Sequence, residues 1–209
     1  MYLRLEQLYT TRLNSELQCL SQIPAIQRRR LSALAKLALN SAVQALQTHQ
    51  VDYIVWVSCF GDEQKTIGIL QDILQGHAPS PTQFSTSVHN AIAGLYSILF
   101  QDATPSTSLS AGWADAMLEA YAFLKTQPNL GKALVVYYDA PLPDMYKEGH
   151  DFEAFSMAAV VALDAPNLIM DLQLASKRSH CVAAKDALEF LAFWQSEQMQ
   201  DVLGMWQRC

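Results

Sequence analysis

The sequence predicts a single α/β domain built on a mixed sheet with helices on both faces. Its length of 209 residues fits one domain. Two short continuous apolar runs, 53–57 and 133–138, are rich in β-branched and aromatic residues, as is typical of strands covered on both faces. Segments with helical spacing of apolar residues alternate with these runs.

Local sequence signals place the elements along the chain. In order, these are a weakly helical segment over 1–23, a helix over 26–47, a strand over 53–57, a helix over 63–74, a loop over 76–81, a helix around 88–99, a strand over 105–110, a helix over 113–125, strands over 133–138, 155–163 and 168–174, and a helix over 182–207.

The boundaries in the first half rest on Pro, Gly and Asp. Apolar residues recur at helical spacing after Pro24. Gly61 ends the first strand, and Asp62 is placed to cap the helix that follows. Gly94 lies in the middle of a helix, where glycine destabilises by about 1 kcal/mol. We therefore expect that helix to pack closely against another element at Gly94.

The second half is predicted to contain four strands, with one helix between the first two and another at the end. Small side chains predict a short strand at 105–110, and Ala111-Gly112 turns it into the next helix. Apolar and polar residues mostly alternate over 168–174, the pattern of a half-buried antiparallel strand. The last helix carries aromatic side chains that we expect to cover a face of the sheet, with a partner-binding helix as the alternative: Phe190, Phe193, Trp194 and Trp206.

Composition limits the partners and the compartment. The formal charge is −6 and the only basic cluster is 28–30, so we expect no nucleic-acid partner. Charged residues make up only 16% of the chain. This favours either an apolar surface that meets a partner chain or an unusually large core. The four cysteines form no C-x-x-C motif, and no signal peptide or apolar run of about 20 residues occurs. We expect a cytoplasmic, reduced protein that does not enter the membrane.

No motif for a cofactor or a metal ion stands out. The eight glycines are dispersed, which excludes the usual nucleotide loops, and the five histidines lack metal-ligand spacing. Ser87 and His89 are two residues apart, so they do not face each other as nucleophile and base; we expect His89 to lie in a helix and bond nearby backbone. We expect Cys59 to be a small core residue.

An acidic cluster follows the strand at 133–138. Paired carboxylates can perform acid–base chemistry, but a solvated acidic loop is the commoner meaning. The cluster comprises Asp139, Asp144, Glu148 and Asp151.

The stretch 80–94 resembles the β-ketoacyl synthases of the thiolase superfamily. In that family a Ser-Pro loop enters a helix with Asn-x-x-Ala-Gly, which matches Asn90, Ala93 and Gly94. Without a gap, Pro105-Ser106 then falls on the family's Gly-Pro-Ser. Residues 28–31 resemble the family's Arg-Arg-Met/Leu segment, and residues 58–61 lie where the family has a small, glycine-rich turn after a strand. The resemblance covers roughly 24–165, which implies an N-terminal segment over 1–23, a β-ketoacyl-synthase N-terminal-like domain over 24–165, and a C-terminal strand and helix over 166–209.

Two departures from the family pattern concern catalysis. Ketosynthases carry a nucleophilic cysteine at the start of the helix after the interface strand, where this chain has Trp113. Their catalytic histidines come from a second α/β half, and this chain is expected to end near the close of the first. The resemblance therefore implies a chain that is not an enzyme on its own.

This combination resembles the half-size chain length factors of type II and aryl-polyene pathways. The resemblance implies a cytoplasmic heterodimer with an active β-ketoacyl-ACP synthase, which brings the acyl carrier protein. The dimer-interface strand would contain Pro105, Thr107, Leu109 and Ala111. Phe60, Gln83 and Phe84 would lie near the end of the acyl tunnel, with ordinary core packing as the alternative for both phenylalanines.

Two other functions stay open. One is a stand-alone acyl-binding or scaffolding protein that forms homodimers through the same strand. The other is an enzyme that uses the acidic loop around 144–151.

Overall fold

A seven-stranded mixed sheet organises the chain, and its strand order is β3-β2-β4-β5-β1-β6-β7. The structure is a computed structural model that describes residues 1–143, 146, 152–177 and 183–209. Its elements are β1 (Tyr2–Arg12), η1 (Gln18–Gln22), α1 (Ala25–Arg30), α2 (Ala33–Leu46), β2 (Tyr53–Ser58), α3 (Glu63–Leu74), α4 (Pro81–Ser85), α5 (Ala91–Phe100), β3 (Ser106–Ser110), α6 (Trp113–Thr126), β4 (Lys132–Asp139), β5 (Phe155–Ala162), β6 (Leu168–Met170), α7 (Leu172–Ser176), α8 (Ala183–Gln195) and β7 (Trp206–Arg208).

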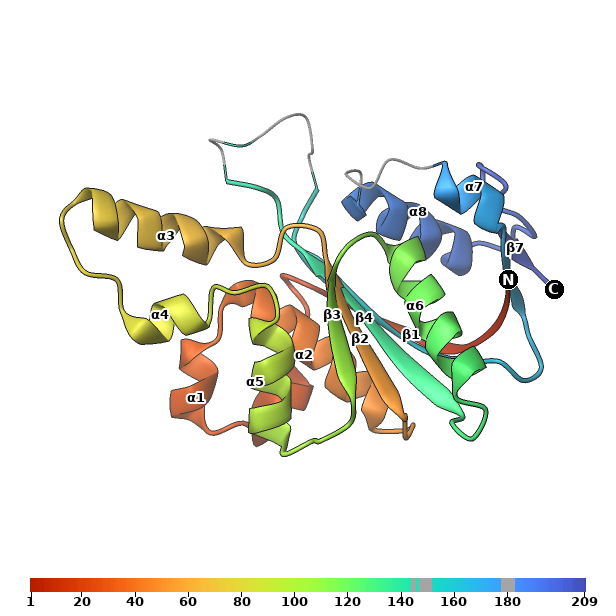
Figure 1. The fold of residues 1–209 in the computed structure, drawn as a ribbon, viewed down its shortest axis with the longest axis horizontal. Helices are drawn as coiled ribbons and strands as arrows, with labels where there is room; N and C mark the ends of the chain where they lie inside the picture. The colour runs from red at the N-terminus through yellow and green to blue at the C-terminus, as the bar shows by residue number, and fades with distance from the viewer. Residues whose placement is uncertain (144–145, 147–151, 178–182) are drawn as a thin grey trace.

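Helices lie on both faces of this sheet, which confirms the predicted fold class. Figure 1 shows α1, α2 and α5 on one face and α6 and α8 on the other. One apolar core joins α2 and α5 to the sheet, and a second joins α6 and α8 to its opposite face. The sheet-facing alanines of α2, such as Ala38 and Ala42, are fully buried. Their small side chains let α2 lie close to the strands.

The parallel strands β2, β3 and β4 form one side of the sheet. β2 pairs with β3 and with β4, and Val55 lies opposite Thr107 on one side and Val135 on the other. Every residue of β2 is buried, as the apolar run at 53–57 predicts for a strand between two helical layers. β5 then runs antiparallel to both β4 and β1.

The prediction of a weakly helical N-terminal segment is wrong. Residues 2–12 form the strand β1, which pairs along most of its length with β5. The register shifts between Leu5 and Gln7, so Glu6 lies in a β-bulge. A bulge interrupts the alternation of buried and exposed residues, and this interruption hides the strand from a search for period-two patterns.

The predicted helix over 26–47 is two helices. α1 ends at Arg30, and the hydroxyl of Ser32 accepts a hydrogen bond from the amide of Ala35 at 3.1 Å to begin α2. α3 has its predicted bounds, but Asp62 makes no capping hydrogen bond to it. The Asp62 carboxylate lies 3.6 Å from Nζ of Lys65 instead.

The expectation of close packing at Gly94 is also wrong. Gly94 is exposed in α5, and a Cβ added there would meet nothing within 4 Å among the described residues. α5 begins at Ala91, so Val88 lies in the preceding turn and is 44% exposed.

The C-terminal segment differs most from the prediction. Only 168–170 form a strand, because Asp171 caps the short helix α7 through the amides of Gln173 and Leu174. The last helix, α8, ends at Gln195, and 206–208 form the strand β7 against β6.

The prediction that aromatic residues of the C-terminal segment cover the sheet is confirmed. Phe190, Phe193 and Trp206 are at most 3% exposed in the core on the α6 face. Trp194 packs against their edge. No helix within the described ranges has both the length and the hydrophobicity to cross a membrane.

Candidate functional site

The ends of β2, β3 and β4 meet the first turn of α6. Parallel strands bring their carboxyl ends to one edge of a sheet, where ligand sites of α/β proteins commonly lie. The candidate site, which we call the strand-end site, comprises the turn 58–61, the segment 111–114, Tyr137, Asp139 and Asp186.

Trp113 is the first residue of α6 and is 0% exposed. Its ring lies 5.1 Å from that of Phe190, between centroids. The indole N–H finds no hydrogen-bond partner in the part of the chain that the structure describes. An indole supplies neither a nucleophile nor an acid–base group, so the side chain at this helix start fills space.

The amide end of α6 is occupied by two carboxylates. Gly112 N donates to Oδ2 of Asp115 at 3.2 Å, and Ala114 N donates to Oδ2 of Asp186 at 3.0 Å. The first amides of a helix have no partners within the helix, and the helix dipole favours negative charge there. Asp186 comes from α8, so α8 helps to close the strand-end site.

Cys59 brings a thiol to the same place. Its Sγ lies 3.7 Å from the carbonyl oxygen of Ala111, to which it donates. Cys59 is half-buried at the end of β2, so the expectation of a simple core residue is only partly met.

Asp139 is fully buried, so the expectation of a solvated acidic loop is wrong for this residue. Its carboxylate accepts hydrogen bonds from Ser58 Oγ at 2.7 Å, from the amide of Cys59 at 3.1 Å, and from the amide of Phe60 at 3.4 Å. Tyr137 Oη also donates to it. Burial raises the pKa of Asp139, and these donors counteract the rise. Asp139 therefore holds the turn 58–61 in place.

The other members of the acidic cluster, Asp144, Glu148 and Asp151, lie outside the described residues.

Tyr137 completes the buried pair with Asp139. Burial, and then the nearby Asp139 carboxylate, raise the pKa of the Tyr137 phenol. Tyr137 therefore stays a neutral donor to Asp139.

Ser87 and His89 bond different groups, as their spacing predicts. Ser87 Oγ donates to the carbonyl of Phe84, while Nε2 of His89 lies 3.0 Å from the carbonyl of Ser58. His89 sits in the turn before α5 and not in a helix. It therefore ties this turn to the end of β2.

The strand predicted as an interface, β3, is an edge strand of the sheet. In Figure 1 it faces the viewer between α5 and α6. Ile54 N donates to the carbonyl of Pro105, and Ala111 N donates to the carbonyl of Ser58. In a parallel ladder the backbone of alternate residues then points away from β2. These are Ser106, Ser108 and Ser110, while Pro105, Thr107, Leu109 and Ala111 direct their backbone toward β2.

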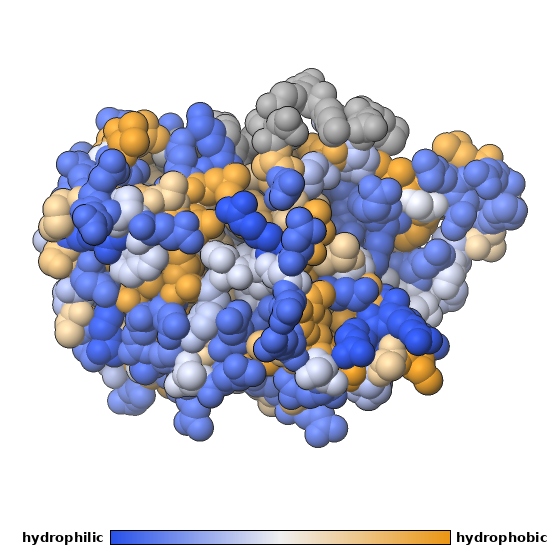
Figure 2. All heavy atoms as spheres, turned by 180° about the vertical axis from the view of Figure 1, so that it is seen from behind, coloured by the Kyte–Doolittle hydropathy of each residue, from blue (hydrophilic) through white to orange (hydrophobic). Residues whose placement is uncertain are grey.

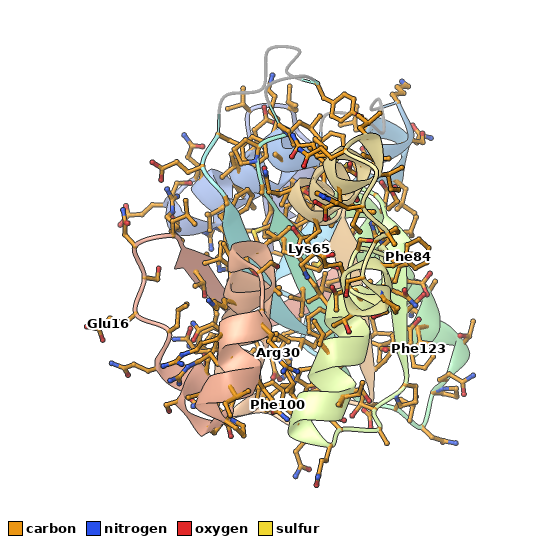
Figure 3. All side chains as sticks on the ribbon, turned by 90° about the vertical axis from the view of Figure 1, so that its left-hand side faces the viewer. Glu16, Arg30, Lys65, Phe84, Phe100 and Phe123 are labelled. Atoms are coloured by element: carbon orange, nitrogen blue, oxygen red, sulfur yellow. The ribbon has the colours of Figure 1, made fainter. Side chains whose placement is uncertain are left out.

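The three predicted tunnel residues do not share one environment. Phe60 is half-buried beside Asp139, whereas Gln83 and Phe84 are exposed on α4. Phe84 is 62% exposed, so core packing within this chain does not explain it. Figure 3 places Phe84 on the same side of the molecule as Phe123 of α6.

Helices α3 and α4 project from the body of the molecule as an arm (Figure 1). Figure 2 shows apolar surface on this arm from behind. Its exposed apolar side chains are Leu70, Ile73, Leu74 and Phe84. Lys65 Nζ donates to the carbonyl of Thr86 and so joins the base of α3 to the segment after α4.

Metal binding finds no support in the described ranges, where no three His, Cys, Asp or Glu side chains are grouped to hold an ion. Sequence reasoning placed Asp139 in a solvated acidic loop instead of a buried site, and it missed Asp186. Asp139 directly follows the apolar run 133–138, and this position at the end of a buried strand was a signal in the sequence for a site residue. Asp186 lies 72 positions from Ala114, and no local pattern relates the two.

Comparison with known proteins gives one family match. The family model described as β-ketoacyl synthase, N-terminal domain, matches residues 6–207. No curated protein matches the chain.

Solved structures share the fold. A chain from a ketosynthase (ApeO) in complex with its chain length factor (ApeC) from Xenorhabdus doucetiae superposes with a TM-score of 0.77 at 23% identity, covering 100% of this chain and 98% of that one. The ishigamide ketosynthase/chain length factor gives 0.56 at 15% identity, over 77% of this chain and 54% of that one. A type II acyl-carrier protein complex with its ketosynthase, AntDE:AntF, gives 0.52 at 13%, over 78% and 62%. The chain thus spans only about half to two thirds of the last two.

Proposed function

The chain belongs to the β-ketoacyl synthase N-terminal domain family, and we propose that it is the non-catalytic, chain-length-factor-like subunit of a β-ketoacyl-ACP synthase. It pairs with an active ketosynthase as a heterodimer in type II fatty-acid or polyketide biosynthesis of the aryl-polyene kind. The partner's cysteine carries the growing acyl chain and performs decarboxylative condensation, and the partner also receives the acyl carrier protein.

The observation that carries this proposal is the buried Trp113 at the start of α6. A helix N-terminus favours a thiolate and supplies amide donors to an oxyanion. An indole at that point has no ionisable group to activate, and its burial leaves no room for an acyl thioester. The residues on either side, Gly112 and Ala114, offer no nucleophile either.

The open edge of β3 supports a paired state. Its outward-facing backbone at Ser106, Ser108 and Ser110 is a template for an added strand. The opposite edge of the sheet is covered, because Gln200 bridges Gln207 and Arg208 N donates to the carbonyl of Met199. Association through strand pairing therefore favours β3.

The apolar arm supports a role at the acyl cavity of the complex. Phe84 and three apolar side chains of α3 are exposed on the same arm, and exposed apolar surface of this kind favours contact with a partner or a ligand. We assign Phe84, Gln83 and Phe60 to the wall that limits the length of the partner's acyl chain. The similar length and fold of a chain from the Xenorhabdus doucetiae complex support the broader proposal that this chain is one subunit of such a pair.

The same open edge favours one alternative, a homodimeric acyl-binding or scaffolding protein. Two copies of β3 would pair across a two-fold axis. The two functions differ in the partner that pairs with β3, so the experiment must distinguish a heterodimer from a homodimer.

The test is co-expression of the tagged chain with a β-ketoacyl-ACP synthase from the same organism, followed by gel filtration and an elongation assay. We expect one heterodimer peak that elongates acyl-ACP with malonyl-ACP, and no elongation by this chain alone. A variant of the ketosynthase without its nucleophile should abolish activity. Two independent peaks, or elongation by this chain alone, would overturn the proposal; a homodimer that ignores the ketosynthase would favour the alternative.

A further inference from the structure

Two side chains of α8 close over the first turn of α6. Asp186 accepts the amide of Ala114 at 3.0 Å, and Phe190, one turn later on the same face, packs on Trp113 at 5.1 Å. Ala187 between them is 0% exposed. α8 thus contacts the helix start through a charged group and an aromatic ring.

The carboxylate of Asp186 fits tightly against the helix. A Cβ added to Gly112 would lie 3.3 Å from Oδ2 of Asp186 and 3.7 Å from Oδ2 of Asp115. The space next to the amides of 112–114 is therefore filled by carboxylate oxygens of the chain itself. A second anion, such as a thiolate or a thioester oxyanion, would have to approach these carboxylates at short range.

We infer that Asp186 is an internal anion that occupies the amide end of α6, so that this chain blocks thiolate chemistry there by charge as well as by the bulk of Trp113. The inference rests on the proposed non-catalytic role and assigns a second residue to it. It implies that replacing Trp113 alone does not create a reactive site.

The opposing effects on a thiol give a measurable consequence. The helix dipole lowers the pKa of a cysteine at a helix N-terminus, whereas a carboxylate a few ångströms away raises it. With Asp186 in place, the second effect offsets the first. Replacing Asp186 with Asn keeps an oxygen acceptor for the amide of Ala114 and removes only the charge.

The experiment compares Trp113→Cys with Trp113→Cys/Asp186→Asn. The rate of alkylation by iodoacetamide, in which the thiolate forms the S–C bond and iodide leaves, is followed against pH by peptide mass spectrometry. We expect Asp186→Asn to lower the apparent pKa of the new thiol by about one unit or more and to speed its labelling at pH 7 by about tenfold. Exposed Cys209 is the reference thiol within each sample.

Matched variants distinguish the effect of removing the Asp186 charge from the effect of loosening the packing around the new thiol. Asp171→Asn removes another helix-capping carboxylate, at α7, and should leave the profile unchanged. Ala114→Cys, with and without Asp186→Asn, repeats the test with a smaller change of volume, and it decides the question if Trp113→Cys does not fold. An unchanged midpoint overturns the inference, and so does a higher plateau rate without a shift of the midpoint. Co-purification with the ketosynthase is scored separately, so failure of the proposed function remains distinguishable.

Discussion

The rings of Trp113 and Phe190 lie 5.1 Å apart, inclined by 37°, and both residues are 0% exposed. This contact joins the start of α6 to α8. The ring of Trp206 of β7 also meets the Phe190 ring edge-on, with centroids 4.7 Å apart. Phe190 is therefore the centre of the aromatic cluster that covers the sheet on this face.

Truncation of this ring should destabilise the chain strongly. Phe190→Ala removes a fully buried ring and leaves a cavity, so we expect a loss of about 3–5 kcal/mol in the free energy of unfolding. Phe84→Ala is the control, because Phe84 is 62% exposed and should change that free energy by only about 0.5 kcal/mol. Urea unfolding measures both. Similar losses in the two variants would contradict the packing described.

Stability should depend on pH through Asp139. Burial raises its folded-state pKa above the unfolded value, so between these two values the folded chain binds more protons than the unfolded chain. Stability relative to Asp139→Asn should therefore fall as pH rises from about 4, by at most about 1.4 kcal/mol per pH unit. The difference levels off once the folded carboxyl is ionised. Urea midpoints of both proteins from pH 4 to pH 8 test this, and parallel curves would count against it.

A proline at position 108, at the centre of β3, should weaken binding of the partner without unfolding the chain. The N–H of Ser108 points away from β2, so Ser108→Pro removes no ladder bond within the chain. We expect the variant to remain folded and to bind the ketosynthase at least about tenfold more weakly, as loss of about 1.4 kcal/mol implies. Pull-down titration and circular dichroism provide the two readouts.

Thr107→Pro is the matched control for Ser108→Pro. The N–H of Thr107 points toward β2, so this change breaks the chain's own sheet and lowers its stability. Full partner affinity in Ser108→Pro would remove β3 from the interface.

The aromatic residues of the proposed tunnel wall should limit product length. Phe60→Ala or Phe84→Ala, tested in the complex with the ketosynthase, should shift products toward longer acyl chains by at least one elongation step, because a smaller side chain leaves room. Product mass spectra give the result. Val202→Ala is the control, since Val202 is 94% exposed at the end of the chain that holds β7. Unchanged products from both phenylalanine variants would exclude them from the wall.

Alanine at position 94 should stabilise the chain. Gly94 lies inside α5, and an added Cβ meets nothing within 4 Å among the described residues. Replacing a helix-interior glycine restricts the unfolded chain, so we expect Gly94→Ala to add up to about 1 kcal/mol. Thermal unfolding measures the change. A loss of stability in the isolated chain would reveal a contact at Gly94 that this structure lacks.

Sequence patterns predicted the elements whose state is set locally. The apolar runs at 53–57 and 133–138 became β2 and β4, and α6 begins at Trp113 after the turn at Gly112. Boundaries that depend on one side chain, such as the Ser32 cap of α2, were missed, although the signal was present in the sequence.

Elements decided by distant partners were beyond such reasoning. β1 is a strand because β5 pairs with it, with Leu8 opposite Ala159. β7 is a strand because β6 lies beside it, with Trp206 opposite Met170. Neither pairing leaves a periodic trace that separates strand from helix, since a bulge interrupts one and the other spans three residues.

The sequence by itself determined the α/β class, the family resemblance and the absence of a nucleophile at position 113, because each depends on residue types and spacing along the chain. Only the tertiary structure decided that Asp139 is buried, that β3 is an edge strand and that Asp186 reaches the amides of α6. Burial and hydrogen bonding between residues 72 to 81 positions apart follow from how the layers pack, and spacing along the chain does not encode them.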